Sequence, residues 1–379
     1  MNILVLNYEY PPMGGGAGNA AKYISEHMAS QGHSVHVITM RHKSLPPSET
    51  INGVAIHRIS SLRRKLNQSN VIEMLSFIVS AIFRYRKTLR GWSPDVSIAF
   101  LGLPSGAVSW WLKKRRRIPY IVSIRGGDVP GTQPEQLKLY HALCKPFIKT
   151  IWRNAQFVVA NSLGLRDLAL ETLPDKDILF IPNGVDLSIF KPGETQHDTS
   201  TLHLLFVGRL SREKRVDLLI HALAAIHHES WDLSIVGDGP ESSTIKSLIA
   251  QRGLSDRISC TGWLDKATLL KTYQRSDIFV FPSTSEGMPN VILEAMACGL
   301  PVVTTRIRGC QELIEHEING LLVKSDDCQE LIQAMERLMS AQNLHRRMSI
   351  FNRETAQKYS WKEVGERYLE LAVQCQRSS

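Results

Sequence analysis

The stretch that decides the fold is Phe281-Pro-Ser-Thr-Ser-Glu-Gly-Met-Pro-Asn-Val-Ile-Leu-Glu-Ala-Met-Ala-Cys-Gly-Leu-Pro-Val-Val303. It follows an apolar strand at 278–281, runs through a loop into a helix that begins near Pro289, and returns to a second strand at 301–304. A strand, a helix and a strand in this order form the repeating unit of a parallel sheet covered by helices. This stretch therefore predicts an α/β fold.

The same stretch places two carboxylates beside a helix start. Glu286 lies on the loop before Gly287, and Glu294 lies about a turn and a half inside the helix. Backbone N–H groups in the first turn of a helix favour anions. A phosphate at the helix start and hydroxyl groups at the carboxylates would suit a phosphorylated sugar. Taken alone, the two glutamates are better explained as ordinary residues of a surface helix. The other motifs of the chain make a binding site the better explanation.

Strands and helices alternate along the whole chain. In the first half, strands are predicted at 3–6, 34–39, 96–100, 120–124 and 157–160, with helices at 17–30, 70–90, 105–114 and 135–154. In the second half, strands are predicted at 203–207, 232–236, 257–261, 278–281, 301–304 and 320–323, with helices beginning near Val216, Ser242, Lys266, Asn290 and Asp327. The alternation predicts two Rossmann-like, doubly wound domains.

A polar, loop-like stretch at 191–201 separates the two runs. We therefore expect an N-terminal domain at 1–190 and a second domain at 191–355. The remaining residues, 356–379, are expected to form a C-terminal helix that packs back on the N-terminal domain.

Composition indicates a soluble globular protein. The chain has 379 residues, of which 43% are hydrophobic and 21% charged. Its 6 cysteines form no Cys-x-x-Cys pair, which favours free thiols in a reducing compartment. The start of the chain is typical of a first strand rather than a signal peptide. The longest apolar run, 71–83, contains Glu73 and is too short to cross a bilayer.

Positive charge is concentrated near the N-terminus. Residues 1–118 hold 16 Lys and Arg against 5 Asp and Glu, and two clusters stand out at 63–65 and 113–117. Between them lies an apolar helix candidate that ends in basic residues. This combination suits an anionic membrane surface, nucleic acid or merely a solvated face. We favour the membrane, because no helix-turn-helix, zinc ligand set or aromatic RNA-binding motif is present.

Glycine-rich and basic loops follow several predicted strands. Gly14-Gly15-Gly16 follows the first strand and opens a helix, but neither Gly-x-Gly-x-x-Gly nor an acidic residue after the second strand is present, which argues against a nicotinamide cofactor. After residue 207, Arg209 and Lys214 are suited to a phosphate. The turn Gly237-Asp-Gly-Pro240 would lie on the same sheet edge. Each loop alone is equally explained as a tight or solvated turn.

The ordered set of motifs resembles the family 4 glycosyltransferases, retaining enzymes of GT-B fold. The resemblance covers essentially the whole chain and rests on the N-terminal Gly-Gly-Gly, Asn183-Gly-Val-Asp186, Val207-Gly-Arg-x4-Lys214, Gly237-Asp-Gly-Pro240 and Glu286-x7-Glu294. It implies two Rossmann-like domains facing a central cleft. The first would bind the acceptor and the second a nucleoside-diphosphate sugar, with no cofactor and no metal.

The resemblance also implies roles for individual residues. Arg209 and Lys214 would bind the donor diphosphate, Glu286 the sugar hydroxyls and Glu294 the ribose. Backbone near Ile258 would contact the base. The remaining donor contacts would come from Gly15, Gly16, Gly287, Met288, Pro289 and Asn290.

One position departs from the family pattern. The family often places a histidine where this chain has Arg125, in Arg125-Gly-Gly-Asp128. Arginine cannot act as a general base at neutral pH. The expected catalytic residues are therefore Arg125, for an anionic group or sugar positioning, Asp128, as the nearest carboxylate that could accept a proton, and Glu286. Asp175-Lys-Asp177 is interpreted as a turn, not a metal site.

We expect a retaining glycosyltransferase that moves a hexose or N-acetylhexosamine to a saccharide or lipid-linked acceptor in surface polysaccharide or lipopolysaccharide assembly. The protein would lie in the cytoplasm, peripherally on the inner membrane, and would bind no nucleic acid. The alternatives are a nucleotide-sugar epimerase of the same fold and a non-catalytic protein that binds nucleotide sugars or nucleic acid.

Overall fold

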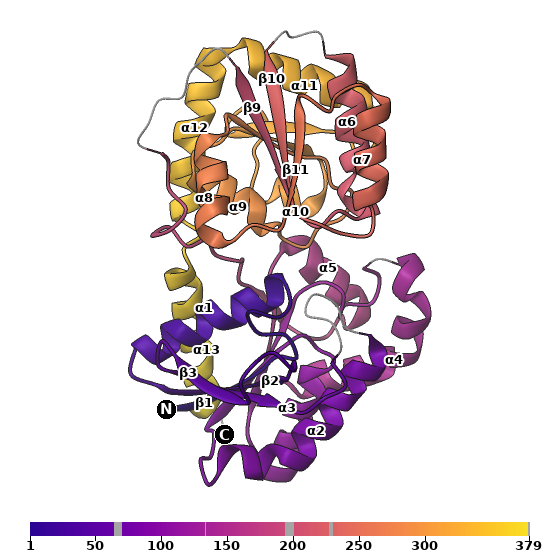
Figure 1. The fold of residues 1–379 in the computed structure, drawn as a ribbon. Coiled ribbons are helices and arrows are strands. Elements are labelled where there is room, and N and C mark those ends of the chain that lie inside the picture. The colour runs from indigo at the N-terminus through magenta and orange to yellow at the C-terminus, as the bar shows by residue number, and fades with distance from the viewer. Residues whose placement is uncertain (64–69, 133, 194–200, 227–229, 378–379) are drawn as a thin grey trace. The chain divides into compact units, whose positions relative to one another are not determined.

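The computed structural model describes residues 1–63, 70–132, 134–193, 201–226 and 230–377. The chain forms two α/β units with parallel sheets, which confirms the predicted fold class (Figure 1). Unit 1 comprises 1–184 and 361–379, and unit 2 comprises 185–360. The chain leaves unit 1 a few residues before the predicted boundary at 190, and 194–200 of the predicted linker lie outside the described residues.

The sheet of unit 1 has the order β3-β4-β2-β1-β5-β6-β7-β8. All neighbours are parallel except β3 and β4. The strands are β1 Asn2–Leu6, β2 Ser34–Met40, β3 Ser48–Ile51, β4 Val54–Ile59, β5 Val96–Phe100, β6 Tyr120–Ile124, β7 Phe157–Ala160 and β8 Ile178–Phe180. The central strands β1, β5 and β6 are buried along almost their whole length, as their predominantly apolar sequences predict.

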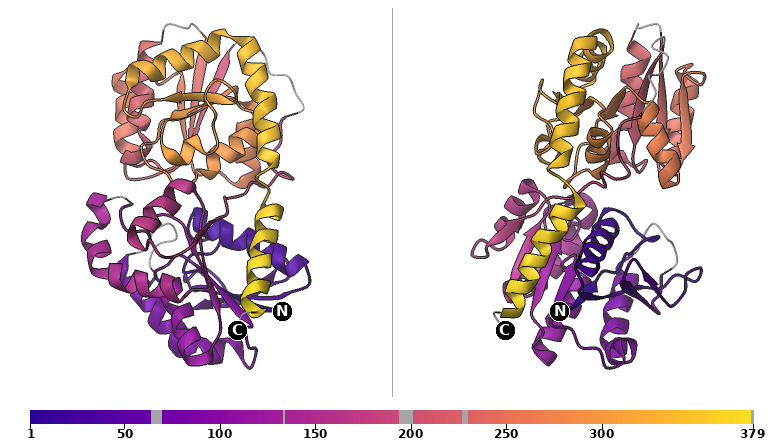
Figure 2. Two further views of the ribbon diagram at one scale, coloured as in Figure 1. Left: turned by 180° about the vertical axis from the view of Figure 1, so that it is seen from behind. Right: turned by 90° about the vertical axis from the view of Figure 1, so that its left-hand side faces the viewer.

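Helices cover both faces of this sheet, which can be followed in the views from behind and from one side (Figure 2). α1 Gly16–Ser30 and α13 Trp361–Arg377 share one hydrophobic core with the sheet. The opposite face packs against α2 Val71–Leu89, α3 Ser105–Arg116, α4 Pro134–Asn154 and α5 Leu163–Thr172.

The hairpin β3–β4 lies outside the predicted elements. Its turn is Asn52-Gly53, with φ of 49° and 81°. Both angles lie in the left-handed region that asparagine and glycine tolerate, and Asn-Gly is a strong hairpin signal. The hairpin adds the only antiparallel pair among the described strands of unit 1.

α13 belongs to unit 1 although it follows unit 2 in the chain. Gly365 lies so close to α1 that a Cβ there would be 2.6 Å from the His27 ring, and the ring itself bonds to Glu366 at 3.0 Å. Tyr368 reaches the sheet through a 2.6 Å hydrogen bond between its hydroxyl and the Ser123 hydroxyl. The C-terminal helix is therefore an integral layer of unit 1.

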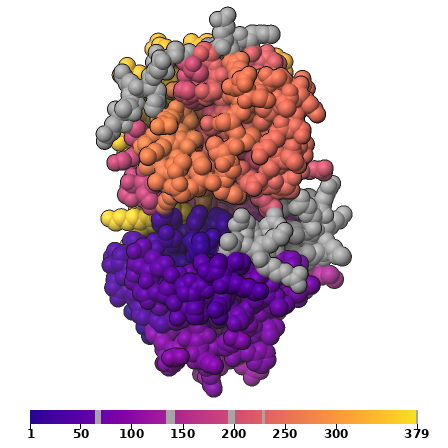
Figure 3. Space-filling model, viewed as in Figure 1, coloured from indigo at the N-terminus to yellow at the C-terminus, as the bar shows by residue number. Residues whose placement is uncertain are grey.

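Unit 2 has a sheet of order β11-β10-β9-β12-β13-β14, with all neighbours parallel. Its strands are β9 Leu202–Val207, β10 Trp231–Val236, β11 Ile258–Gly262, β12 Ile278–Phe281, β13 Val302–Thr305 and β14 Gly320–Val323. Its helices are α6 Val216–Ala225, α7 Ser242–Gln251, α8 Lys266–Arg275, α9 Asn290–Ala297, α10 Arg308–Gln311, α11 Cys328–Ser340 and α12 Gln342–Gln357, with a short 3-10 helix, η1, at Arg212–Lys214. Residues of α7, α8 and β11 fill one face of this unit (Figure 3).

Within the described ranges, no helix has the length and apolar content needed to cross a bilayer.

Candidate functional site

The loops after β9, β10 and β12 meet at one edge of the unit 2 sheet, because parallel strands end on the same side. Two glycines bring the first two loops together. A Cβ on Gly237 would overlap the carbonyl oxygen of Gly208, and one on Gly239 would overlap that of Leu210. A 3.1 Å bond from the Leu210 N–H to the Asp238 carbonyl ties the same loops. This close backbone packing therefore requires glycine at 237 and at 239.

The centre of this edge is an ion pair between Lys214 and Glu286. The two side chains are only 17% and 12% exposed, so water screens their charges weakly. The Ser283 hydroxyl donates a 2.7 Å hydrogen bond to the same Glu286 carboxylate, and the Lys214 ammonium lies 5.1 Å from the centre of the Phe281 ring. Two residues 72 positions apart in the sequence thus form one charged site.

Backbone contacts hold the two halves of this site in register. The carbonyl of Glu213, next to Lys214, accepts bonds from the Thr284 N–H at 2.8 Å and the Ser283 hydroxyl at 3.0 Å. On the other side, a Cβ on Gly309 would lie 2.8 Å from the Glu286 carbonyl oxygen and would overlap that of Gly287. Gly309 therefore lets α10 close against the loop that carries Glu286.

The helix α9 begins directly after this loop, as predicted. Pro289 is its N-cap residue, and no side chain makes a capping bond there. The positive end of the helix dipole therefore points toward the loop at 286–289. Met288 in this loop is buried, and Asn290 is the first residue of the helix.

Glu294 lies one turn further along α9. Its carboxylate accepts a 3.0 Å hydrogen bond from the Tyr273 hydroxyl of α8. Burial raises the pKa of Glu294 to about 7, an effect that the Tyr273 bond and the charge of Lys266 partly offset. At neutral pH the residue is divided between its protonated and ionised forms, so it can either donate or accept a hydrogen bond.

Two further residues were predicted to contact the donor, Arg209 and Ile258. Arg209 is on the correct loop, and its side chain is exposed. Ile258 is buried at the first residue of β11, whereas the loops of the site follow the last residues of the strands. The predicted contact at Ile258 is therefore not at this edge. The corresponding residues at the end of β11 are Gly262 and Trp263, whose side chain is 57% exposed.

In unit 1, the glycine-rich loop follows β1 and Gly15 is the N-cap of α1, which begins at Gly16. A Cβ on Gly15 would meet no atom within 4 Å, so the backbone here is open to a ligand. Glu9 lies under the loop and pairs with Arg63 at 3.5 Å. Arg63 is buried, so it does not belong to the exposed basic surface that was favoured as a membrane contact, and 64–65 lie outside the described residues.

Arg125, in the position of the expected histidine, holds together separate parts of unit 1. Its guanidinium donates to the Ser123 hydroxyl at 2.9 Å, to the Asn183 side-chain carbonyl and to the Tyr368 hydroxyl at 3.1 Å. It also lies 5.2 Å from the centre of the Phe100 ring. These contacts join β6 and α13 to Asn183, which lies near the end of the first of the two segments that form unit 1. They account for the arginine structurally, and its catalytic role stays a prediction.

Asp128 is buried and braces the loop after β6. One carboxylate oxygen accepts the Gly102 N–H at 2.7 Å, and the other accepts the N–H groups of Arg125 at 3.0 Å and Gly126 at 3.1 Å. Burial raises the pKa of Asp128, and these three bonds oppose that rise. The predicted role of Asp128 as proton acceptor stays untested beside this bracing role.

We expect Asp128→Asn to lower the free energy of unfolding by about 2 kcal/mol, because an amide cannot accept all three N–H groups. Chemical denaturation measures the change, and Asp177→Asn, at an exposed turn before β8, is the control. An unchanged free energy of unfolding combined with a large loss of kcat would instead show that Asp128 acts in the reaction.

Several residues of the site were not predicted from the sequence. Ser283 and Phe281 belong to the quoted stretch, but their contacts with the ion pair depend on the folded loop. Tyr273 and Gly309 lie outside every motif. The sequence signal near Gly309 is its neighbour Arg308, which follows a strand. A basic residue after a strand is too common a pattern to predict a functional site. Within the described residues, no group of three His, Cys, Asp or Glu side chains is placed to hold a metal ion.

Two protein families match this chain, one in each unit. Residues 15–184 match the "Glycosyl transferase 4-like domain", and 189–355 match "Glycosyl transferases group 1". Among curated proteins, the chain is 28% identical over 384 residues to an uncharacterized glycosyltransferase of Methanocaldococcus jannaschii, and the alignment covers 96% of each chain.

Solved structures share the fold at low sequence identity. Sucrose-phosphate synthase from Thermosynechococcus elongatus superposes with a TM-score of 0.87 at 22% identity, covering 100% of both chains. Anabaena HepE in complex with UDP-glucose gives a TM-score of 0.79 at 19% identity, covering 99% of this chain and 100% of HepE. The family matches, the relative and the shared fold lead to one conclusion: the chain belongs to the family 4 glycosyltransferases of GT-B fold and is a transferase enzyme.

Proposed function

We propose that the enzyme transfers a hexose or N-acetylhexosamine from a nucleoside-diphosphate sugar to an acceptor hydroxyl with retention at the anomeric carbon. The observation that carries this proposal is the weakly screened ion pair Lys214–Glu286 beside the start of α9, where no side chain makes a capping bond. A cation and a helix dipole suit a diphosphate, and carboxylates suit sugar hydroxyls. HepE, which shares the fold, binds UDP-glucose, and this supports a nucleotide-sugar donor.

In the proposed reaction, the bond between the anomeric carbon and the diphosphate oxygen breaks as the acceptor oxygen forms the new bond. Lys214 and the start of α9 stabilise the negative charge that develops on the departing diphosphate. Retention brings the acceptor hydroxyl to the face from which the diphosphate leaves. The hydroxyl proton therefore passes to a diphosphate oxygen, and Asp128 keeps its three backbone bonds.

Glu294 is proposed to accept hydrogen bonds from the ribose in its ionised form. Because its pKa is raised to about 7, the ionised fraction falls as the pH drops below neutrality. We expect the KM for the donor to rise about tenfold for each pH unit below 7 and to level off above pH 8. Initial rates at varied donor concentration measure this, and Glu294→Gln should remove the dependence. A dependence that persists in the Gln variant would assign the titration to another group.

The direct test of the proposed function is a screen of nucleoside-diphosphate sugars against saccharide and lipid-linked acceptors. We expect release of free nucleoside diphosphate to depend on the acceptor, and the product linkage to keep the anomeric configuration of the donor. Interconversion of nucleotide sugars without an acceptor would instead identify an epimerase.

We also propose that the acceptor is a lipid-linked saccharide of surface polysaccharide or lipopolysaccharide assembly, and that the enzyme attaches peripherally to the cytoplasmic face of the inner membrane. The surplus of basic residues within 1–118 supports an anionic lipid surface as the partner.

A further inference from the structure

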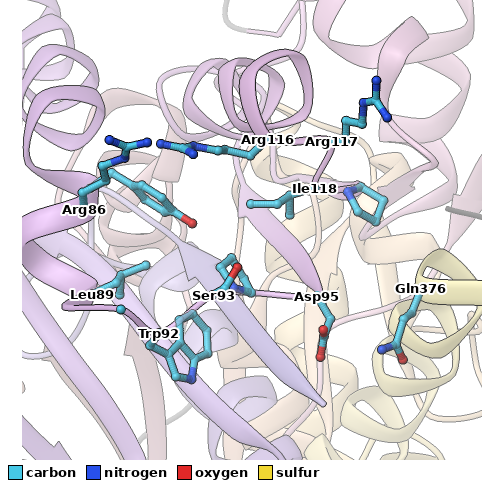
Figure 4. A pocket seen from close by; sticks show the side chains of 13 residues that line it. Arg86, Leu89, Trp92, Ser93, Asp95, Arg116, Arg117, Ile118 and Gln376 are labelled. Carbon is cyan, nitrogen blue, oxygen red and sulfur yellow. The ribbon is translucent and has the colours of Figure 1, made fainter.

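A second basic site lies in unit 1, away from the glycine-rich loop and Asp128. It is a pocket of about 680 Å³ at the edge where β5 and β6 begin, whereas those two features follow the ends of strands. Its lining comes from the end of α2, the end of α3 and the last turn of α13 (Figure 4). The residues that matter here are Arg86, Trp92, Asp95, Arg116, Arg117 and Gln376.

Two guanidinium groups at the rim of this pocket have no carboxylate partner among the described residues. Arg86 and Arg116 make no ion pair there and extend toward one another, whereas the Arg117 side chain extends away from them (Figure 4). Like charges held close together repel each other, and a bound anion relieves that repulsion. The pocket is therefore built to attract an anion.

The one carboxylate in the lining does not neutralise these arginines. Asp95 lies on the strand side of the pocket, where its carboxylate accepts the backbone N–H of Asn2 at 2.7 Å. The arginines come instead from the ends of α2 and α3, where Arg115 and Lys114 add further exposed positive charge.

The exposed face of α2 leads from apolar residues to this pocket. Ile72, Leu75, Val79 and Phe83 follow one another at helical spacing on the solvent side, and Phe83 is 83% exposed. Arg86 continues the same line one turn later. The single acidic residue of α2, Glu73, is buried in the capping box with Asn70. An exposed apolar stripe with basic residues and no exposed acid is typical of a surface that lies on an anionic bilayer.

We propose that the α2 stripe inserts into the surface of an anionic membrane and that Arg86 and Arg116, at the rim of the pocket, bind a phosphate of a lipid headgroup. The inference rests on the proposed peripheral attachment and names the residues responsible for it. Arginine guanidinium forms paired hydrogen bonds with phosphate oxygens, and Phe83 one turn before Arg86 enters the acyl boundary.

The test is sedimentation of the full chain with vesicles of phosphatidylcholine, with and without phosphatidylglycerol. The pocket variant R86Q/R116Q is compared with R84Q/R115Q, which removes one arginine from each of the same two helices but from outside the pocket lining. We expect the control pair to lower the partition coefficient about fivefold, and the pocket pair to lower it at least about ten times more. Phe83→Ser should weaken binding strongly, while Ile350→Ser, at an exposed apolar site of unit 2, should not.

The outcomes separate the pocket from general attachment. Equal losses in the two arginine pairs would overturn the headgroup site, even if the parent protein binds the anionic vesicles. Absence of binding by the parent protein would overturn both. Glycerol phosphate that competes fully with vesicles would show a site for a soluble phosphate instead of a lipid. Acceptor-dependent release of nucleoside diphosphate, measured with a soluble acceptor, should be unchanged in all variants and tests the proposed function separately.

Discussion

Lys214→Ala is expected to lower kcat/KM for sugar transfer about 10³-fold, the largest effect of any single substitution in unit 2. The ammonium lies in a weakly screened site, where it is the cation bonded to Glu286. Its removal takes away the charge that stabilises the departing diphosphate, and it leaves the Glu286 carboxylate with the Ser283 hydroxyl but without its cation. Steady-state kinetics with the donor found in the screen measure the loss.

Arg212→Ala is the matched control for this prediction. Arg212 belongs to the same short helix, but its side chain is 90% exposed and lies 3.8 Å from the Glu241 carboxylate. We expect a change of less than about twofold, because exposed charges are well screened. Comparable losses in the two variants would mean that overall positive charge on this loop matters, and not the Lys214–Glu286 pair. Thermal unfolding of both variants excludes a folding defect.

Gly309→Ala is expected to disable the same site from a position that contacts no substrate. The new Cβ would overlap the Gly287 carbonyl oxygen and lie 2.8 Å from that of Glu286, so the loop that carries Glu286 must move. Displacement of a loop by about 1 Å lowers kcat/KM about 10²-fold, and the clash lowers the free energy of unfolding by about 2–4 kcal/mol. Kinetics and chemical denaturation of the same variant measure the two effects.

Gly193→Ala is the control for Gly309→Ala, because it also adds one methyl group at a glycine of unit 2. A Cβ at Gly193 would lie 3.3 Å from Cβ of Gln274 and 3.4 Å from its carbonyl oxygen, contacts that need a shift of only a few tenths of an ångström. We expect activity close to that of the parent protein. If Gly309→Ala retained full activity as well, the close contact of α10 with the Glu286 loop would not position the carboxylate.

Much of the fold follows from apolar runs that are buried on both faces. The strands β5 and β6 occupy the predicted residues, because apolar residues dominate each of them and each contains a single buried serine, Ser97 or Ser123. The edge strand β8 has three residues, too few for a pattern. The helix α5 has a usable start signal, since Ser162 accepts the Leu165 N–H at 3.0 Å, but no helix is predicted from the sequence over its ten residues.

The sequence predicted which residues form the site, but it did not predict which of them contact each other. Lys214 and Glu286 were expected at one sheet edge because each follows a parallel strand. Their direct bond depends on how two loops fold over β9 and β12, which no local pattern encodes. Arg125 is the opposite case. Its place in a motif predicted a functional role, whereas the structure shows three hydrogen bonds that join distant segments. Long-range partners of this kind become visible only in the folded chain.

The return of α13 to unit 1 has a topological consequence. Unit 2 is an insert within unit 1, and its two ends are neighbours: the Val185 N–H bonds to the Tyr359 carbonyl at 2.7 Å. The ends of the host unit also meet, since a Cβ on Gly184 would lie 2.7 Å from the Trp361 nitrogen. The chain thus enters and leaves unit 2 through two segments that lie next to each other. A polypeptide that joins Gly184 to Trp361 through a short linker would preserve every strand connection of the host.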